Sequence, residues 1–241
     1  MSKPLTLAVN ELFGPTIQGE GKNIGMPCFF LRLAGCPVQC VWCDTKYSWD
    51  WEHYQSKEER RIMKVDSVLD VLESKNVIFR HIKALVVSGG EPMTQQQALI
   101  PLLKVVRQQW SWWTEIETAG VNMPECSDMV NQFTVSPKLE NSKVPRENRL
   151  KWEVLKAYAG FGSKTVWKFV VDDPNELAEV NEIVRQAGIM LNKQLVYVMP
   201  LGTNSTKLKH TSERLIQDIL HSGYRITPRM HIELWGTRRG V

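Results

Sequence analysis

Residues 35–44 read Gly35-Cys36-Pro37-Val38-Gln39-Cys40-Val41-Trp42-Cys43-Asp44, which places three cysteines in the spacing CxxxCxxC. Thiolates are the usual protein ligands of iron–sulfur clusters, and a cluster held by four of them has no open position. Three thiolates leave one iron free to bind another molecule, so the spacing favours a catalytic 4Fe-4S centre. A structural zinc site would need a fourth ligand, and the next histidine, His53, has no paired ligand beside it.

The remaining cysteines argue against a secreted, disulfide-bonded protein. The chain of 241 residues has five cysteines, an odd number, and no secretory segment at its start. Cys28 and Cys126 lie outside the triplet and are expected to be buried as small apolar residues. No apolar run approaches the length that crosses a bilayer. We therefore expect a cytoplasmic protein without membrane contact, since a reducing compartment keeps thiolates available for iron.

Composition indicates a globular enzyme rather than a nucleic-acid-binding protein. The chain is 43% hydrophobic and 23% charged, with a formal net charge of +4. A basic excess of this size, spread over both signs of charge, does not predict a nucleic-acid partner. The length fits one domain, residues 1–241, with a substantial core.

Short β-branched runs alternate with helical patterns, which is typical of a parallel sheet wrapped by helices. Expected strands are Leu5–Val9, Phe29–Leu33, Ala84–Val87, Thr114–Glu117, Gln132–Val135, Val166–Val171, Leu195–Val198 and Tyr224–Thr227. Expected helices are Val65–Ser74, Thr94–Gln108, Asn175–Ala187 and Ser212–His221, the last capped by Thr211 and closed by Gly223. The alternation predicts an α/β fold, an incomplete (β/α) barrel, because clear strands outnumber helices.

The polar and glycine-rich segments of the chain follow the expected strands. The cysteine run follows Phe29–Leu33, and the later segments are Ser88-Gly89-Gly90-Glu91-Pro92, Ala119-Gly120 and Ser136-Pro137-Lys138. In barrels of this kind the chemistry lies at the C-terminal ends of the strands. We therefore expect these segments to surround one site.

Several short motifs follow one another along the chain: Phe13-Gly14-Pro15-Thr16-Ile17-Gln18-Gly19-Glu20-Gly21, Leu31-Arg32-Leu33-Ala34-Gly35-Cys36, Cys43-Asp44-Thr45, Val87-Ser88-Gly89-Gly90-Glu91-Pro92, Glu117-Thr118-Ala119-Gly120, Ser136-Pro137-Lys138 and Leu234-Trp235-Gly236-Thr237-Arg238-Arg239-Gly240-Val241. Taken in this order, they resemble the 7-carboxy-7-deazaguanine synthase (QueE) family of the radical S-adenosylmethionine (SAM) superfamily, which implies that the α/β fold is an incomplete (β/α) barrel of the radical SAM type. The resemblance spans the chain, and the Thr-Ile-Gln-Gly-Glu-Gly segment is its most specific part.

The resemblance implies a homodimeric lyase that converts 6-carboxy-5,6,7,8-tetrahydropterin to 7-carboxy-7-deazaguanine. Ammonia is lost in this reaction, which belongs to the biosynthesis of 7-deazapurines of the queuosine type. The implied cofactors are a 4Fe-4S cluster, SAM and Mg²⁺. The implied electron donor is a flavodoxin-type protein.

The family motifs also assign roles to individual residues. They place cluster ligands at Cys36, Cys40 and Cys43, magnesium at Thr45, SAM contacts at Trp42, Cys43, Asp44, Gly90, Ser136, Pro137 and Lys138, and substrate contacts at Ile17, Gln18, Gly19, Arg32 and Ser88. Arg32 stands on an apolar strand, where a guanidinium needs a carboxylate partner. The substrate supplies one, and a protein Asp or Glu is the alternative. The roles of Glu20, Glu91 and Glu117 stay open, and the five histidines, which lack metal or triad spacing, are assigned none.

The chain stops at Gly240-Val241 after a basic segment. An α-carboxylate accepts paired hydrogen bonds from an edge like that of a pterin, and in relatives the terminal carboxylate approaches the substrate. We hypothesise that Val241 binds the substrate in this way and that Arg238 or Arg239 anchors the tail to charged neighbours. The alternative is a frayed end, which is usual for terminal residues.

Two other functions share the cysteine spacing. One is a radical SAM activase that installs a glycyl radical on a partner protein, and the other is an iron–sulfur binding module without catalysis. The Gln18 loop and the metal position at Thr45 argue against the activase.

Overall fold

The computed structural model describes residues 4–241, with the backbone alone at positions 190 and 191. The described residues form one nine-stranded sheet in the order β3-β1-β2-β4-β5-β6-β7-β8-β9. The strands are β1 (Thr6–Ile17), β2 (Pro27–Leu33), β3 (Arg61–Lys64), β4 (Ala84–Gly89), β5 (Trp113–Thr118), β6 (Gln132–Val135), β7 (Thr165–Val171), β8 (Val196–Pro200) and β9 (Arg225–Ile226). Neighbours from β2 to β9 are parallel, whereas β1 is antiparallel to both β2 and β3.

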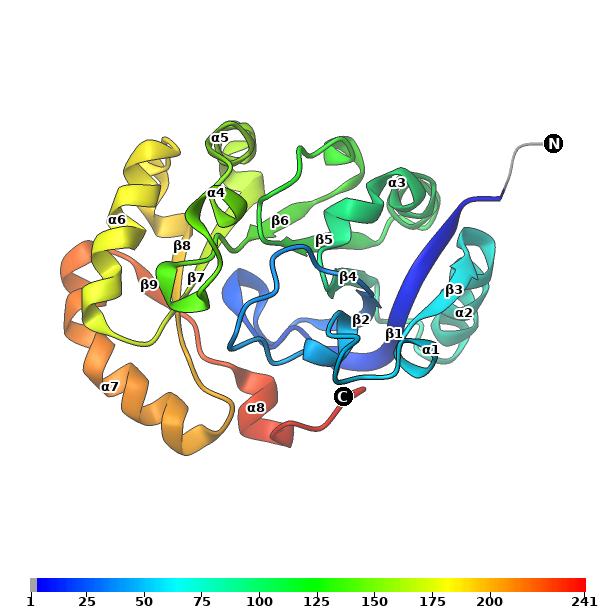
Figure 1. The fold of residues 1–241 in the computed structure, drawn as a ribbon. Helices are drawn as coiled ribbons and strands as arrows, with labels where there is room; N and C mark the ends of the chain where they lie inside the picture. Colours follow the sequence, from blue (N-terminus) through cyan, green and yellow to red (C-terminus); the bar gives the residue numbers. More distant parts are fainter. Residues whose placement is uncertain (1–3) are drawn as a thin grey trace.

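The helices are α1 (Ser56–Glu59), α2 (Val65–Ile78), α3 (Gln96–Lys104), α4 (Arg146–Arg149), α5 (Trp152–Ala159), α6 (Leu177–Gln186), α7 (Ser205–Ser222) and α8 (Met230–Trp235). Helices α2, α3, α5, α6 and α7 lie on the outside of the curved sheet, whereas α8 lies on the open side near the C-terminus (Figure 1). The sheet does not close, because β3 and β9 are its two edges. The expected α/β fold with an incomplete barrel is therefore confirmed.

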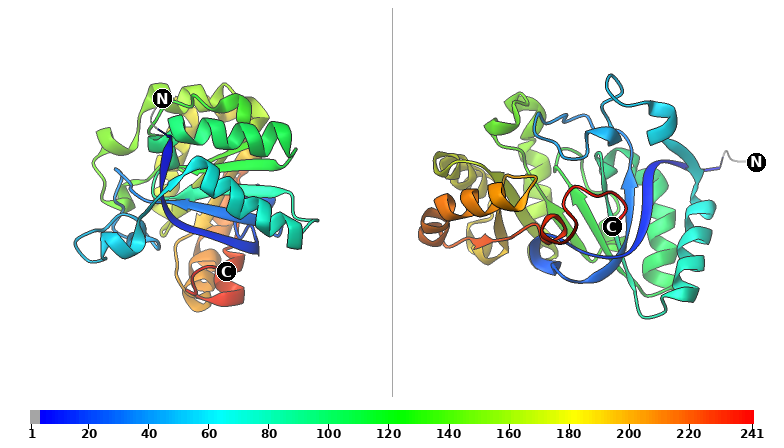
Figure 2. Two further views of the ribbon diagram at one scale, coloured as in Figure 1. Left: turned by 90° about the vertical axis from the view of Figure 1, so that its right-hand side faces the viewer. Right: turned by 90° about the horizontal axis from the view of Figure 1, so that it is seen from below.

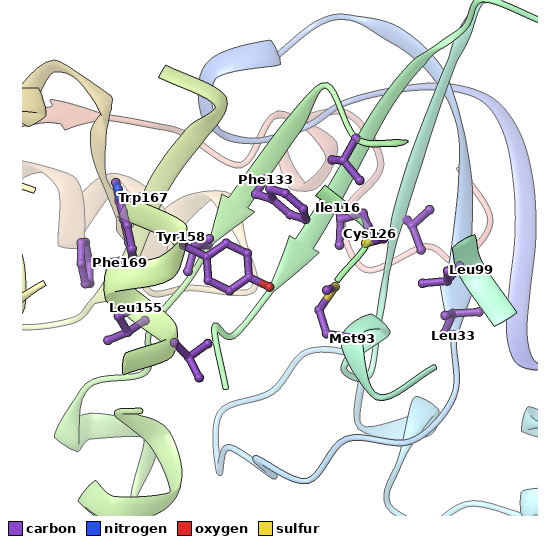
Figure 3. Close-up of a cluster of buried hydrophobic side chains, with 14 of the residues drawn as sticks. Leu33, Met93, Leu99, Ile116, Cys126, Phe133, Leu155, Tyr158, Trp167 and Phe169 are labelled. Atoms are coloured by element: carbon purple, nitrogen blue, oxygen red, sulfur yellow. The ribbon is translucent and has the colours of Figure 1, made fainter. Parts of the chain in front are cut away.

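The core lies between the sheet and the outer helices. Strands covered on both faces read as continuous apolar runs, and β7 is buried along its whole length. Phe133 of β6 meets Tyr158 of α5 edge-on, with ring centroids 5.1 Å apart, and stacks on Phe161 at 5.8 Å. Figure 3 shows Phe133 and Tyr158 packed among Leu155 and Met93. This layer fixes β6, and with it the loop that follows β6.

Three expectations about elements need correction. The first strand continues to Ile17 instead of ending at Val9, because irregularities in its register with β2 let it bend and keep pairing. Strand β3 and helices α1, α4, α5 and α8 were not among the expected elements. Helix α7 begins after Asn204, whose Oδ1 accepts a hydrogen bond from the amide of Lys207 at 2.9 Å. Thr211 is instead buried inside α7, while Gly223 closes the helix with φ +72° as expected.

No helix within residues 4–241 combines the length and apolar character needed to cross a membrane. The chain ends on the open side of the barrel. In the view from below (Figure 2, right), the red C-terminal segment crosses in front of the strands. The C-terminal segment lies beside β1, since the Nε of Arg239 donates a hydrogen bond to Glu11 of β1 at 3.0 Å.

Replacing Phe133 with Ala should lower the free energy of unfolding by about 3–5 kcal/mol, because it leaves a cavity between two aromatic neighbours. Phe79→Ala is the matched control, since Phe79 is 37% exposed whereas Phe133 is fully buried. Its effect should stay within about 0.5 kcal/mol. Urea unfolding followed by circular dichroism measures both, and equal effects would contradict this account of the core.

Candidate functional site

A cavity of about 290 Å³ opens at the C-terminal ends of the strands. Its walls include residues of β1 and of the cysteine run, together with the last residue of the chain. The predicted site residues that line it are Ile17, Gln18, Gly19, Arg32, Cys36, Cys40, Trp42, Cys43, Asp44, Thr45, Ser88, Gly90, Ser136, Lys138 and Val241. Of the predicted set, Pro137 alone is not in the lining.

The cysteine loop is held from several sides. The indole of Trp42 donates to Asn141 Oδ1 at 3.0 Å, and the amide of Val41 donates to the Ser142 carbonyl at 3.1 Å. The indole of Trp49 donates to the sulfur of Cys43 at 3.3 Å. Burial raises the pKa of Cys36 to about 11 and raises that of Cys40. Ionised thiolates at this site thus require a cation bound to them.

The donor set fits a cluster better than a single ion. Within residues 4–241, no three Cys, His, Asp or Glu side chains converge as ligands of one metal ion. A 4Fe-4S cluster takes each thiolate on a different iron, so its ligands stand apart around a shared volume. Cys36, Cys40 and Cys43 all line the same cavity, as the ligands of such a cluster would.

The backbone of the Gly89-Gly90 turn lies against the cysteine loop. A Cβ on Gly90 would lie 1.9 Å from the carbonyl oxygen of Gly35, and Gly89 has φ +119°. Both positions therefore require glycine. The next residue, Glu91, is buried and accepts hydrogen bonds from the amides of Met93 and Ala119. This carboxylate supports the loop, which answers the question that the sequence left open.

Also in the cavity wall, Gln18 and Ser88 are fixed by carboxylates of β5. The side-chain amide of Gln18 donates to Glu115 at 3.2 Å and to Glu117 at 3.1 Å. The hydroxyl of Ser88 donates to the second oxygen of Glu117 at 2.7 Å. Glu117 lines the cavity, so these groups present donors and acceptors together.

Sequence reasoning missed Glu115. It is 1% exposed, and it accepts hydrogen bonds from Thr134 and Asn23, both at 2.7 Å. Burial, with a smaller contribution from Glu117, raises the pKa of Glu115 to about 7. Glu115 could have been identified from the alternation of side chains along the strand. Residues two apart point to the same face, and Glu117 was already expected at the site.

Arg32 has a protein partner. Its Nε donates to Glu11 Oε2 at 3.0 Å, and its guanidinium lies 5.8 Å from the ring centroid of Phe13. The alternative of a protein carboxylate is thus confirmed for one edge of Arg32. Within residues 4–241, no protein acceptor takes a hydrogen bond from its Nη atoms.

Glu20 is the centre of a charged network that the sequence did not reveal. Its carboxylate accepts hydrogen bonds from Lys168 of β7 and, at 3.0 Å, from Arg229, which also pairs with Asp44. Burial alone would raise the pKa of Glu20, but Lys168 and Arg229 hold it below its ordinary value. Lys168 and Arg229 follow no recognisable motif, so only their placement in the fold identifies them.

His231, to which the sequence assigned no role, lines the cavity. Its Nε2 lies 3.8 Å from a carboxylate oxygen of Glu20. A Cβ on Gly19 would lie 2.3 Å from the ring Nδ1, so the histidine also explains the glycine. Thr45 lines the cavity with its hydroxyl 3.5 Å from the sulfur of Cys43.

The C-terminal segment is folded back over the site. Residues 236–241 all line the cavity. The amide of Met230, at the start of α8, donates to the Gly19 carbonyl at 2.9 Å and so ties this segment to the Gln18 loop. The frayed end considered from the sequence is not what the structure shows.

Known proteins match the whole chain. The family described as "4Fe-4S single cluster domain" matches residues 17–158. The 7-carboxy-7-deazaguanine synthase of Pyrobaculum aerophilum is 34% identical over 243 residues, covering 100% of both chains. That of Halobacterium salinarum is 29% identical, covering 95% of this chain and 90% of its own. The crystal structure of QueE from Escherichia coli shares the fold, with a TM-score of 0.71 at 23% identity over 94% of this chain and 95% of that one.

The raised pKa of Glu115 predicts a pH dependence of stability. Between its ordinary value of 4.5 and about 7, the folded chain keeps a proton that the unfolded chain has lost. Stability from this group is therefore complete at low pH and declines as pH rises through that window. Urea unfolding at pH 5 and pH 8 should show that Glu115→Gln costs less stability at pH 8. An equal cost at both pH values would show that Glu115 has the same protonation in the folded and unfolded chains.

Proposed function

Because the chain belongs to the 7-carboxy-7-deazaguanine synthase family, we propose that the cavity at the strand ends is its active site. The chain is a radical SAM carbon–nitrogen lyase. It converts 6-carboxy-5,6,7,8-tetrahydropterin to 7-carboxy-7-deazaguanine with loss of ammonia, in the biosynthesis of 7-deazapurines. Membership of this family argues against the two alternatives that share the cysteine spacing, a glycyl-radical activase and an iron–sulfur module without catalysis.

The observation that carries the assignment of the site is the meeting of distant segments around one cavity. Residues 17–20, the cysteine loop, the Gly89-Gly90 turn and residues 236–241 all line it. When bound, the 4Fe-4S cluster and SAM, the family's cofactors, supply radical hydrogen abstraction. The residues of the chain then have to hold the cofactors, orient the substrate and exclude water.

One end of the cavity suits the cofactors. Cys36, Cys40 and Cys43 would hold the cluster, and SAM would lie beside Trp42, Asp44, Gly90, Ser136 and Lys138. Pro137 would shape the loop between Ser136 and Lys138 without touching the cavity. The close backbone approach at Gly90 leaves room for the amino group of SAM, because no Cβ intervenes.

The other end suits the pterin. Gln18, Ser88 and Glu117 offer mixed donors and acceptors to the heterocycle, with Ile17, Gly19 and the carboxylate of Val241 beside them. The Nη groups of Arg32 would bind the carboxylate of the substrate, while Glu11 holds the Nε edge. A guanidinium fixed on one side in this way is pre-organised for a second carboxylate.

Further features follow from the family resemblance. Thr45 would contribute one oxygen ligand to Mg²⁺, which keeps most of its octahedron for water and substrate oxygens. The remaining assignments concern the protein as a whole. They are a homodimer, a flavodoxin-type electron donor, a cytoplasmic location and a single domain over residues 1–241.

The activity is tested by anaerobic incubation of the reconstituted protein with the carboxytetrahydropterin, SAM, reductant and Mg²⁺. Mass analysis should detect 7-carboxy-7-deazaguanine, and the replacement of Cys36, Cys40 or Cys43 by Ala should abolish it, because two thiolates hold a cluster poorly. Cys28→Ala and Cys126→Ala are controls, since both side chains are buried away from the cavity. Loss of cluster absorption in either control would contradict the ligand assignment.

The magnesium site is tested at Thr45. Thr45→Ser keeps the hydroxyl and should preserve the stimulation of turnover by Mg²⁺, whereas Thr45→Ala should weaken it strongly. Turnover is measured over a magnesium titration. An alanine variant with an unchanged titration would move the metal to other ligands.

A further inference from the structure

Arg239, near the C-terminus, makes an unusually complete set of contacts for a terminal residue. Its Nη atoms donate to both carboxylate oxygens of Glu59, at 2.9 and 2.7 Å, and its Nε donates to Glu11 Oε1 at 3.0 Å. The guanidinium also lies 3.7 Å from the ring centroid of Tyr47. The two acceptors come from different parts of the chain, because Glu59 ends α1 and Glu11 lies on β1.

An isolated surface ion pair contributes little to stability, so the geometry decides the value of these contacts. The pairing with Glu59 is bidentate, which matches the fork of the guanidinium. Glu59 is itself held by Asn10, whose side-chain amide donates to its carboxylate at 2.9 Å. The side chain of Arg239 is 42% exposed, whereas those of Glu11 and Glu59 are each 16% exposed. A partly exposed arginine of the tail thus meets carboxylates that are mostly buried and, for Glu59, already held.

Glu11 connects this contact to the substrate end of the cavity. One of its oxygens accepts from Arg239, and the other accepts from Arg32, both at 3.0 Å. Both arginines also lie near the ring of Tyr47, with the Arg32 guanidinium 6.0 Å and the Arg239 guanidinium 3.7 Å from its centroid. The tail and Arg32 therefore share one carboxylate and one aromatic ring.

We propose that Arg239 is a positioning residue that latches residues 236–241 across the cavity and, through Glu11, holds Arg32 in its substrate-binding orientation. The role of Arg32 in this statement rests on the proposed function. Docking of the tail and binding of substrate then favour each other, because both depend on the position of Glu11. The cysteine loop is held by Trp49 and Ser142 instead, so the latch does not act on the cluster.

The first measurement needs no activity. In the purified full-length protein, hydrogen exchange followed by mass spectrometry should be faster in residues 236–241 of Arg239→Gln than in the wild type. Arg61→Gln is the matched control, since this exposed side chain forms no ion pair within residues 4–241. Unchanged exchange in Arg239→Gln would overturn the latch, whether or not the enzyme turns over the pterin.

The second measurement tests the coupling to Arg32. Arg239→Gln should raise KM for the carboxytetrahydropterin by roughly tenfold, while the rate of SAM cleavage without substrate stays unchanged. Glu11→Gln should raise KM as well, and the double variant should add little to either change, because both act on one network. Additive effects, or faster exchange of the tail with an unchanged KM, would contradict the coupling.

Discussion

The structure depends on the pairing of one enclosed carboxylate, Glu20. Buried charges are tolerated only when partners surround them, and Glu20 is bonded by Lys168 and Arg229. These three side chains come from the loop after β1, from β7 and from the segment before α8. The loop after β1 reaches the last segment of the chain a second time, where the amide of Gly21 donates to Thr227 at 2.7 Å. These contacts join the loop after β1 to β7 and to the segment before α8, on the open side of a sheet whose edge strands do not meet.

The same network explains why cofactor and substrate positions lie together. Arg229 pairs with Asp44, which directly follows Cys43 of the cysteine run. It also pairs with Glu20, which lies directly after the Gln18 loop. The loop that would carry the cluster and the loop that would carry the pterin are thus fixed to one guanidinium, which is 6% exposed. The reaction brings SAM and pterin into contact, so the loops that bind them need a fixed position relative to each other, which Arg229 provides.

The sequence predicted the parts of the site that carry short motifs, and it failed where the fold alone brings residues together. The three cysteines, Gly90 and Arg32 could be predicted, since each needs a specific ligand geometry or backbone freedom. Lys168, Arg229 and His231 stand far from the motifs in sequence and are recognised only by their distance to Glu20. The course of β1 was missed for a related reason, because its irregular register interrupts the alternation that identifies a strand.

In the proposed active site, one cavity holds cofactor and substrate between the cysteine loop and the folded-back C-terminus. The most direct measurement is an anaerobic crystal structure of the reconstituted protein with SAM and the carboxytetrahydropterin. We expect a 4Fe-4S cluster on the three cysteines, and the substrate carboxylate within hydrogen-bonding distance of the Nη atoms of Arg32. A pterin bound outside the cavity lined by Gln18, Arg32 and Val241 would contradict the account.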